Sequence, residues 1–344
     1  MSKHRTRQAG RREWLGGRFR LPIYIRKPDP VRPHAIVWMD QMSRFIITFE
    51  AVLPEAPDSV LLDHFRKALH DPRVGAARRP ACLRVAKDRW AELLRGALGD
   101  EFEIRVGPTP EILDAIRQFV DDVNPGGATP SYLDHRLSPG TVGRLFRAAA
   151  DLYRLSPWKV IGGEEHLLLL DAPRFDLIGA SISIIGALGE HHGVLVYESL
   201  ASYEAFIRQA EQFGRSQPRR SELRTPALSV TFNDPTRLPP EMVREVGQYG
   251  WELAGPSAYP LVMAFDADNV ARPLSERDCE LAAACCLVVG RLVARLAADS
   301  RIDPASAREA IVVETLPDKP SVAVALPLLD ISRPRDPHDS SLPS

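Results

Sequence analysis

The sequence predicts an α+β protein of two domains, an N-terminal α/β domain and a C-terminal domain around a mainly antiparallel sheet flanked by helices. Three observations support this fold class. The chain has 344 residues, enough for two domains of ordinary size. Its first half alternates strand-like runs with amphipathic helical runs, which is typical of an α/β layer. Its second half contains three closely spaced strand-like runs, and such short connections favour antiparallel pairing.

Residues 35–123 are expected to form the small α/β domain, with the element order ββαβαβα. Both strands of a hairpin fall within 35–53, where β-branched and aromatic residues lie on either side of a turn. The helix that follows, at 58–71, presents one apolar face and ends before Pro72. The remaining expected elements are a strand at 81–86, a helix at 88–99, a strand at 102–106 and a helix at 109–123.

A run rich in proline and glycine at 124–137 is the expected linker. Residues 138–330 then form the mixed domain, which begins with a strongly amphipathic helix that ends at Pro157. Polar residues from 331 to 344 predict a disordered tail. The other expected elements are strands at 166–171, 180–187, 193–198, 227–232 and 259–265, helices at 199–213, 239–250 and 275–296, and a final hairpin at 310–329.

Residues 1–34 are expected to form a basic arm. They contain ten Lys or Arg and two acids, a net charge of +8, which leaves −9 on the rest of a chain whose total is −1. A basic arm can bind nucleic acid or another anionic surface. The same pattern also fits a solvated tail, or a tail that lies on its own acidic body. The arginines that would contact nucleic acid are Arg5, Arg7, Arg11, Arg12, Arg18 and Arg20.

Composition and cysteine usage predict a cytoplasmic protein without a membrane partner. The chain is 44% hydrophobic and 26% charged, as in a globular protein. The N-terminal apolar stretch is interrupted by Arg18 and Arg20, so it does not form a secretory signal. The most apolar later run, at 281–297, is interrupted by Arg291 and Arg295. The four cysteines form no CxxC pair and are expected to be buried, reduced thiols.

The stretch IIGALGEHHGVLVY at 184–197 predicts a hairpin and no metal site. Gly186 and Gly189 can adopt the positive φ that tight or bulged connections need. Neighbouring residues on a strand point to opposite faces, so His191 and His192 are expected to diverge. Glu190 is expected to cap backbone amides at the turn. The alternative is a metal held by Glu190 and His192 at i, i+2 with His166 as a third ligand.

The second half resembles an uncharacterised bacterial domain family of unknown function. That family pairs a helix ending in Pro-Trp with a Gly-x-x-Gly-Glu-x-x-Gly-Leu-x-Val-Tyr hairpin, a Tyr-Pro strand and an Arg-x-Pro stretch before a helix. The resemblance covers about residues 138–297 and implies a shared fold without naming a reaction. It departs where Val194 replaces leucine and where Arg272 and Pro273 are adjacent. The matching residues here are Pro157, Trp158, Gly186, Gly189, Glu190, Gly193, Val196, Tyr197, Tyr259, Pro260 and Arg272.

The first half resembles the opening of an integrase-type ribonuclease H core at VWMDQMSRFIITFEAV, residues 37–52. The resemblance implies that Asp40, Asp88 and Glu111 would hold two Mg²⁺ or Mn²⁺ ions about 4 Å apart for phosphoryl transfer. Several features depart from that pattern. Arg89 directly follows Asp88, and only 22 residues separate Asp88 from Glu111. One hairpin precedes the first helix, where the fold expects three strands. The three acids also fit ordinary roles in a turn, at a helix N-cap and in a first helical turn.

The leading functional hypothesis is a non-enzymatic binding or accessory module without a cofactor. Its partner would be an unknown protein or small molecule bound in a groove near Trp158, Glu190 and Tyr197. The alternative is a metal-dependent nuclease, or a degenerate ribonuclease H-like protein that binds nucleic acid. A phosphate-binding Walker loop, a Gly-x-Ser-x-Gly elbow and a His-Glu-x-x-His helix are all absent from the sequence.

Overall fold

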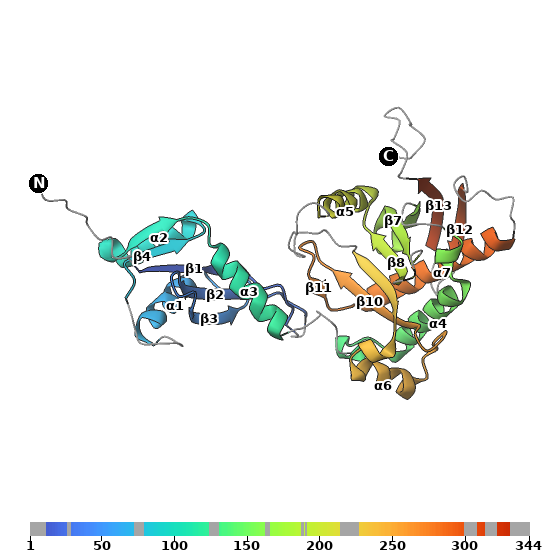
Figure 1. Cartoon of the computed structure of the whole chain (residues 1–344), viewed down its shortest axis with the longest axis horizontal. Coiled ribbons are helices and arrows are strands. Elements are labelled where there is room, and N and C mark those ends of the chain that lie inside the picture. Colours follow the sequence, from blue (N-terminus) through green and yellow to red (C-terminus); the bar gives the residue numbers. More distant parts are fainter. Residues whose placement is uncertain are drawn as a thin grey trace, which may run out of the picture. The chain divides into compact units, whose positions relative to one another are not determined.

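A computed structural model describes residues 12–25, 29–71, 79–123, 131–161, 166–186, 189, 191–213, 227–298, 308–313 and 322–330. The chain divides into two compact units, unit 1 up to Gly127 and unit 2 from Ala128 onward (Figure 1). The α+β fold class is confirmed, with an α/β unit first and an antiparallel sheet flanked by helices second.

Unit 1 is a five-stranded sheet with the order β3-β2-β1-β4-β5. Its first three strands pair antiparallel, whereas β4 and β5 run parallel to β1. The element order is therefore βββαβαβα. The bounds are β1 (Glu13–Arg20), β2 (His34–Asp40), β3 (Ile46–Val52), α1 (Ser59–His70), β4 (Cys82–Val85), α2 (Asp88–Leu98), β5 (Glu103–Val106) and α3 (Pro110–Val123).

Strand β1 corrects the expected basic arm. Residues 13–20 are the central strand of the sheet and pair with both β2 and β4. The arm prediction is wrong for this segment because Gly16 and Gly17 weakened its strand signal, since glycine is depleted in strands. Here glycine is required, because a Cβ at Gly16 would lie 2.2 Å from the Trp38 ring. The expected order ββαβαβα was therefore one strand short.

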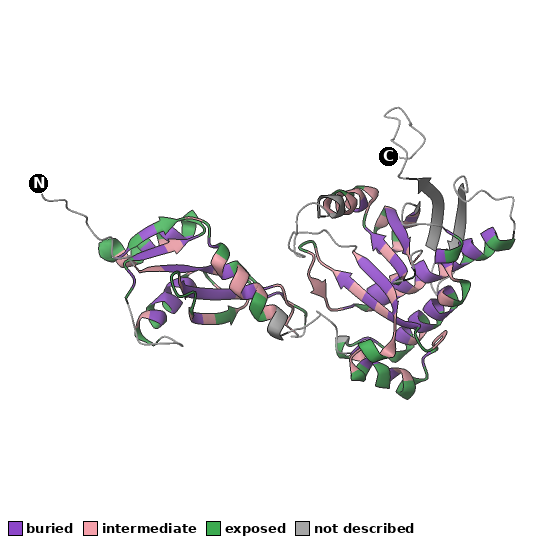
Figure 2. Cartoon of the chain, in the orientation of Figure 1, coloured by how far each residue is buried: buried purple, intermediate pink, exposed green. Residues whose placement is uncertain are grey.

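Buried residues run along β1 and β2 (Figure 2), and the sheet of unit 1 has a hydrophobic core on each face. Helices α1 and α2 cover one face, where Phe65 lies between Trp38 and Phe102 with ring centroids 4.9 and 5.2 Å away. Helix α3 covers the other face and packs Ile112 and Ile116 against β1 and β2. Such burial of large aromatic and aliphatic side chains is the main stabilising contribution to a unit of this size.

Unit 2 is built on an eight-stranded antiparallel sheet with the order β11-β10-β9-β8-β7-β6-β13-β12. The expected three-strand meander is β6-β7-β8, and the expected final hairpin is β12-β13. The strands are β6 (His166–Ala172), β7 (Leu177–Ile185), β8 (His192–Tyr197), β9 (Leu228–Asn233), β10 (Tyr259–Phe265), β11 (Ala271–Arg272), β12 (Arg308–Val313) and β13 (Val322–Asp330). The helices are α4 (Pro139–Leu155), α5 (Leu200–Phe213), α6 (Pro240–Tyr249) and α7 (Glu276–Ala298).

The two faces of this sheet differ in what covers them. Helices α4 and α7 pack against each other over one face, and the largest core of the protein lies between them and the sheet. Helix α5 lies over the other face, where Tyr197 and Tyr203 form a smaller cluster with Leu167. Helix α7 is long and apolar enough to span a membrane by length and composition. However, 61% of its most apolar stretch of 18 residues is buried inside the unit. A buried core helix accounts for its composition.

The end of the expected linker belongs to unit 2. Tyr132 and Leu137 are 0% and 4% exposed and lie in the main core. The Tyr132 hydroxyl donates to the Pro260 carbonyl at 2.7 Å, and it accepts from the Val262 amide at 2.9 Å. Glu245 of α6 accepts hydrogen bonds from the Tyr132 and Leu133 amides. The expectation of a linker over 124–137 is therefore wrong for residues 131–137, since its proline and glycine content masked a packed segment.

The hairpin expected at 184–197 is present as β7 and β8. Gly186 and Gly189 have φ values of 123° and 83°, which favour glycine. Gly193 serves a different purpose, because a Cβ there would lie 2.2 Å from the Val230 carbonyl oxygen of β9. Glycine thus permits both the turn and the close approach of the next strand.

Candidate functional site

The two helices that build the candidate site begin at well-defined caps. At the start of α4 the Ser138 hydroxyl accepts from the Thr141 amide at 3.1 Å, and Pro139 takes the first helical position. Near the start of α7, Asp278 accepts from the Ser275 amide at 2.8 Å and from both terminal nitrogens of Arg272 at 2.7 Å. These contacts fix the position of the first turns of both helices.

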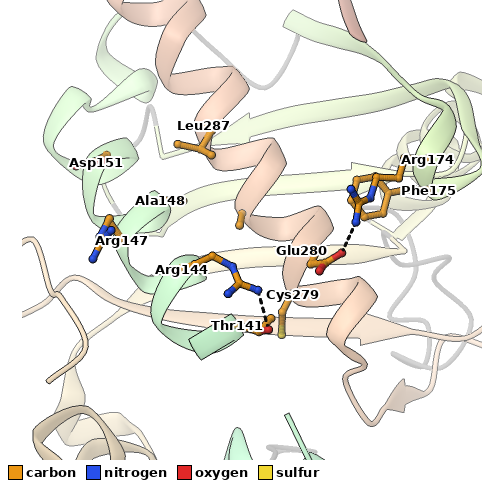
Figure 3. Close-up of a pocket in the computed structure, with 11 residues that line it drawn as sticks. Thr141, Arg144, Arg147, Ala148, Asp151, Arg174, Phe175, Cys279, Glu280 and Leu287 are labelled. Atoms are coloured by element: carbon orange, nitrogen blue, oxygen red, sulfur yellow. Dashed lines mark hydrogen bonds and ion pairs between the residues drawn. The ribbon is translucent and has the colours of Figure 1, made fainter. Parts of the chain in front are cut away.

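A groove of about 190 Å³ lies between α4 and α7, with a short 3₁₀ turn, Pro173–Phe175, along one side (Figure 3). We call it the α4/α7 groove. All its lining residues belong to unit 2. They are Thr141, Arg144, Arg147, Ala148 and Asp151 of α4, Arg174 and Phe175 of the turn, and Cys279, Glu280, Ala283 and Leu287 of α7.

Three arginines give the groove its positive character. Arg174 donates to Glu280 at 3.1 Å, yet its Nη1 atom is buried and has no hydrogen-bond partner in the structure. Arg144 donates through Nη2 to the Thr141 hydroxyl at 2.9 Å. Arg147 is exposed and forms no ion pair with any described residue. These guanidinium groups keep unused donors beside the groove.

The carboxylates around the groove are already engaged. Glu280 is paired with Arg174, and Asp151 accepts from Arg154 at 3.1 Å. Three arginines against two carboxylates leave a formal charge of +1 on the lining, before Arg154 is counted. The planar guanidinium of an arginine matches the geometry of a carboxylate or phosphate. The arginine-lined side of the groove can therefore bind an anionic group.

The floor of the groove is apolar. Ala148, Ala283 and Leu287 line it from the helices, and Phe175, 6% exposed, closes one side. Cys279 lies at the base with no exposed surface, and burial raises the pKa of its thiol well above the usual range. A thiol held protonated in this way is a poor nucleophile. The arrangement can bind a small anion that also carries an apolar group.

Trp158 and Tyr197, which the sequence suggested as a shared binding surface, are not brought together. Trp158 is 7% exposed and packs on the α4/α7 face of the sheet, where its ring lies 5.9 Å from that of Phe232. Tyr197 is 1% exposed and lies on the opposite face, 5.1 Å from Tyr203. The prediction of one groove for both is wrong, because they come from segments that pack on opposite faces. Glu190, the third residue of that prediction, lies outside the described residues.

The two neighbouring histidines of the hairpin do diverge. His191 is exposed, whereas the His192 ring packs against Trp158 with the centroids 4.5 Å apart. Among the residues that the structure describes, no three His, Cys, Asp or Glu side chains are placed to hold a metal ion. The alternative site of Glu190, His192 and His166 depends on side chains outside this set, so it stays untested.

The three carboxylates of the nuclease hypothesis do not form one site. Asp40 ends β2, pairs with Arg12 at 3.1 Å and accepts from the Ser43 amide at 2.9 Å, so it organises the β2–β3 turn. Asp88 is the exposed first residue of α2, after the N-cap Lys87.

The strand register separates these two acids. Trp14 of β1 is level with both Asp40 and Leu83, and Asp88 lies five residues beyond Leu83. At about 3.3 Å per residue the two acids are roughly 15 Å apart along the sheet. Glu111 pairs with Arg84 at 3.3 Å, and Arg84 also lies 3.5 Å from Glu13. A shared pair of metal ions about 4 Å apart is therefore not built by Asp40, Asp88 and Glu111, and that prediction is wrong.

The arginines of the expected arm lie in different environments. Arg18 is held inside unit 1, where it donates to the Leu53, Pro54 and Ala56 carbonyls. Arg12 pairs with Asp40, and Arg20 is exposed at the end of β1. Arg5, Arg7 and Arg11 lie outside the described residues.

Sequence reasoning missed the arginines of the α4/α7 groove. Arg144 and Arg147 are three residues apart beside the buried face of α4, which reads as an ordinary solvated face of an amphipathic helix. A cationic pair next to apolar positions was the available signal. The sequence around Arg174 contains no such signal, because its partner Glu280 is 106 residues away.

Comparison with known families agrees with the sequence resemblance. Residues 143–313 match the model of a family described as Domain of unknown function (DUF7309). Residues 1–123 match a second model, described as Domain of unknown function (DUF6930). A search of the curated proteins finds no match. Two domains of unknown function thus account for most of the chain, which confirms the family-level prediction.

Proposed function

We propose that this protein is a cytoplasmic, non-enzymatic binding or accessory module whose unit 2 binds a small organic anion in the α4/α7 groove. The observation that carries the proposal is the Nη1 atom of Arg174, which is buried at the groove without a hydrogen-bond partner. Leaving a buried donor unsatisfied costs about 1–3 kcal/mol, and more for a charged group. Arg174 lines the groove, and a small rotation of its side chain would present that donor to a carboxylate or phosphate oxygen there.

The chemistry of the lining favours binding over reaction. Burial keeps the Cys279 thiol protonated, and both carboxylates of the groove are engaged by arginines. A nucleophilic thiol needs a lowered pKa, whereas burial raises that of Cys279. The contacts present are those that orient and hold an anion.

The shape of the groove points to the class of ligand. The arginines meet one part of the ligand, and Ala148, Ala283, Leu287 and Phe175 meet another. The expected ligand carries one carboxylate or phosphate on a short aliphatic or aromatic body. Hexanoate and hexyl phosphate are simple probes of this class, and hexanol and hexylamine are matched controls with the same chain.

Thermal unfolding with these four probes tests the proposal. A ligand that binds only the folded state raises the melting temperature by mass action. Hexanoate or hexyl phosphate is expected to raise it, and the two controls are expected to leave it unchanged. Equal shifts with hexanol would show an apolar site without anion recognition. The proposal would be contradicted if neither anion changed the melting temperature at concentrations where the controls also leave it unchanged.

A second proposal concerns unit 1, which we infer to be a degenerate ribonuclease H-like module that binds nucleic acid. Its support is the element order, because the three strands that this fold expects before the first helix are β1, β2 and β3. Catalysis by Asp40, Asp88 and Glu111 is not part of this proposal, since the strand register separates Asp40 from Asp88. Binding of nucleic acid by the full chain is its test.

A further inference from the structure

A cationic surface of unit 1 lies where the parallel strands β1 and β4 end. Arg20 is the last residue of β1, His34 faces it as the first residue of β2, and Lys87 follows β4. Ligands of open α/β sheets bind outside the carboxyl ends of the parallel strands. We call this surface the basic edge. It consists of Arg18, Arg20, Arg32, His34, Lys87 and Arg89.

Contacts between these residues show that they form one surface. Arg18 donates through Nε to Nδ1 of His34 at 3.2 Å. Arg18 also lies 3.4 Å from Asp58, and Arg89 lies 3.2 Å from the other oxygen of the same carboxylate. Lys87 and Arg89 both lie over the Trp90 ring, 5.0 and 5.7 Å from its centroid. The cations are thereby connected from β1 to α2.

The surface has a net positive charge. Arg18, Arg20, Arg32, Lys87 and Arg89 contribute five positive charges, and Asp58 and Asp88 contribute two negative ones, which gives +3. His34 reports this potential, because burial and then the charges of Arg18, Arg20, Lys87 and Arg32 lower its pKa. Since Nδ1 of His34 accepts from Arg18, the neutral ring carries its proton on Nε2 as a further donor.

The basic edge combines fixed anchors with accessible cations. Arg32 is buried and donates to the Leu21 carbonyl at 3.0 Å, and the Arg18 side chain is only 8% exposed. Arg20 and Lys87 are exposed, and the Arg89 side chain is 60% exposed. The three exposed cations can reach phosphates while the buried ones hold the surface in shape.

The position of the exposed apolar side chains argues against a lipid surface as the partner. Met42 and Phe45, 74% and 63% exposed, are the most exposed large apolar residues described in unit 1. They lie in the β2–β3 turn, at the opposite end of β2 from His34. An interfacial membrane surface would combine cations with apolar side chains on one side.

We propose that the basic edge binds the phosphate backbone of nucleic acid. It does so through Arg20, Lys87 and Arg89, supported by Arg18 and Arg32. This deepens the second proposal above and is independent of the α4/α7 groove. Backbone contacts of this kind position a protein without reading sequence, so binding is expected to be sequence-tolerant and sensitive to salt.

Fluorescence anisotropy of the full chain with labelled single-stranded DNA, single-stranded RNA and duplex DNA tests this proposal. The triple variant Arg20→Ala/Lys87→Ala/Arg89→Ala is compared with Arg66→Ala/Lys67→Ala/Arg79→Ala, which removes three exposed cations elsewhere on unit 1. The first is expected to weaken binding at least about tenfold at low salt and to reduce the slope of log affinity against log salt by about two. The second is expected to change affinity less than about twofold.

The possible outcomes separate the two proposals for unit 1. If the wild-type chain binds and both triple variants lose affinity equally, the basic edge is refuted while nucleic-acid binding stands. If the wild-type chain does not bind any of the three probes, both fail together. Binding to phosphatidylserine vesicles without binding to nucleic acid would also overturn the inference. Circular dichroism of each variant checks that it is folded.

Discussion

Arg174 donates to Glu280 across 3.1 Å, and the other terminal nitrogen of the same guanidinium is buried without a hydrogen-bond partner. The pair joins the 3₁₀ turn after β6 to α7 and forms one side of the α4/α7 groove (Figure 3). Glu280 accepts from only one terminal nitrogen of this planar fork, so the second buried donor is left for another acceptor. The pair is therefore a structural contact and, in the proposed function, half of the anion site.

Replacing Glu280 by glutamine is expected to separate these two roles. The free energy of unfolding should fall by about 1–2 kcal/mol, because a partly buried charge loses its partner. Affinity for hexanoate should rise, since Arg174 loses the carboxylate that competes for its donors and the lining loses a negative charge. Calorimetric titration and urea unfolding measure the two effects. Glu252→Gln, which removes an exposed partner of Arg154, is the control and should change neither.

Gly16→Ala tests the central position of β1. The new Cβ would lie 2.2 Å from the Trp38 ring, so unit 1 should lose about 1–3 kcal/mol through overpacking. Gly96→Ala is the control, because nothing lies within 4 Å of its Cβ and alanine favours the helix by about 0.5–1 kcal/mol. Urea unfolding followed by circular dichroism compares the two. A Gly16→Ala variant as stable as the wild-type chain would contradict the central position of β1 and restore the interpretation of residues 1–34 as an arm.

Asp278→Asn is expected to change the response of unit 2 to acid. Burial alone would raise the pKa of Asp278, but hydrogen bonds from Arg272 and Ser275 outweigh it and lower the pKa. A group whose pKa is lowered on folding stabilises the protein above its unfolded pKa, about 3.9 for Asp, and loses that contribution as the pH falls. The variant should be about 3 kcal/mol less stable at pH 7, and the difference should shrink below about pH 4. A constant difference from neutral to acidic pH would contradict the assigned charge pairing.

Trp158→Ala tests whether this residue belongs to the core or to a binding surface. The ring packs against Tyr153, His192 and Phe232, so its removal should cost about 3–5 kcal/mol. Ile178→Ala, at a residue that is 67% exposed on β7, should stay within about 0.5 kcal/mol of wild type. Urea unfolding measures both variants. A stable Trp158→Ala variant would return Trp158 to the list of candidate ligand contacts.

The fold of unit 2 could be predicted because its signals are local. Gly186 and Gly189 mark the turn between two β-forming runs, and both have the positive φ that a glycine turn allows. The short connections of the meander then imply antiparallel pairing. In contrast, β1 was missed because Gly16 weakens a strand locally and is explained only by the Trp38 ring of the neighbouring strand.

The candidate sites could not be predicted because they depend on contacts between distant segments. Asp40 and Asp88 follow strand-like runs and appeared equivalent in sequence, but the register of β1 with β2 and β4 places them at opposite ends. Arg174 and Glu280 are far apart in sequence, and only the packing of α4 and α7 brings the lining of the groove together. Residue type alone carries no information on these distances.

Isothermal titration of hexanoate into three versions of the full chain tests the central claim most directly. Arg144→Gln/Arg147→Gln removes two cations of the α4/α7 groove, and Arg244→Gln removes one exposed cation of α6 outside the lining. We expect binding by the wild-type chain and by Arg244→Gln, and at least about tenfold weaker binding by the double variant, since two charge-assisted contacts are lost. Equal affinity in all three versions would contradict anion binding in the α4/α7 groove.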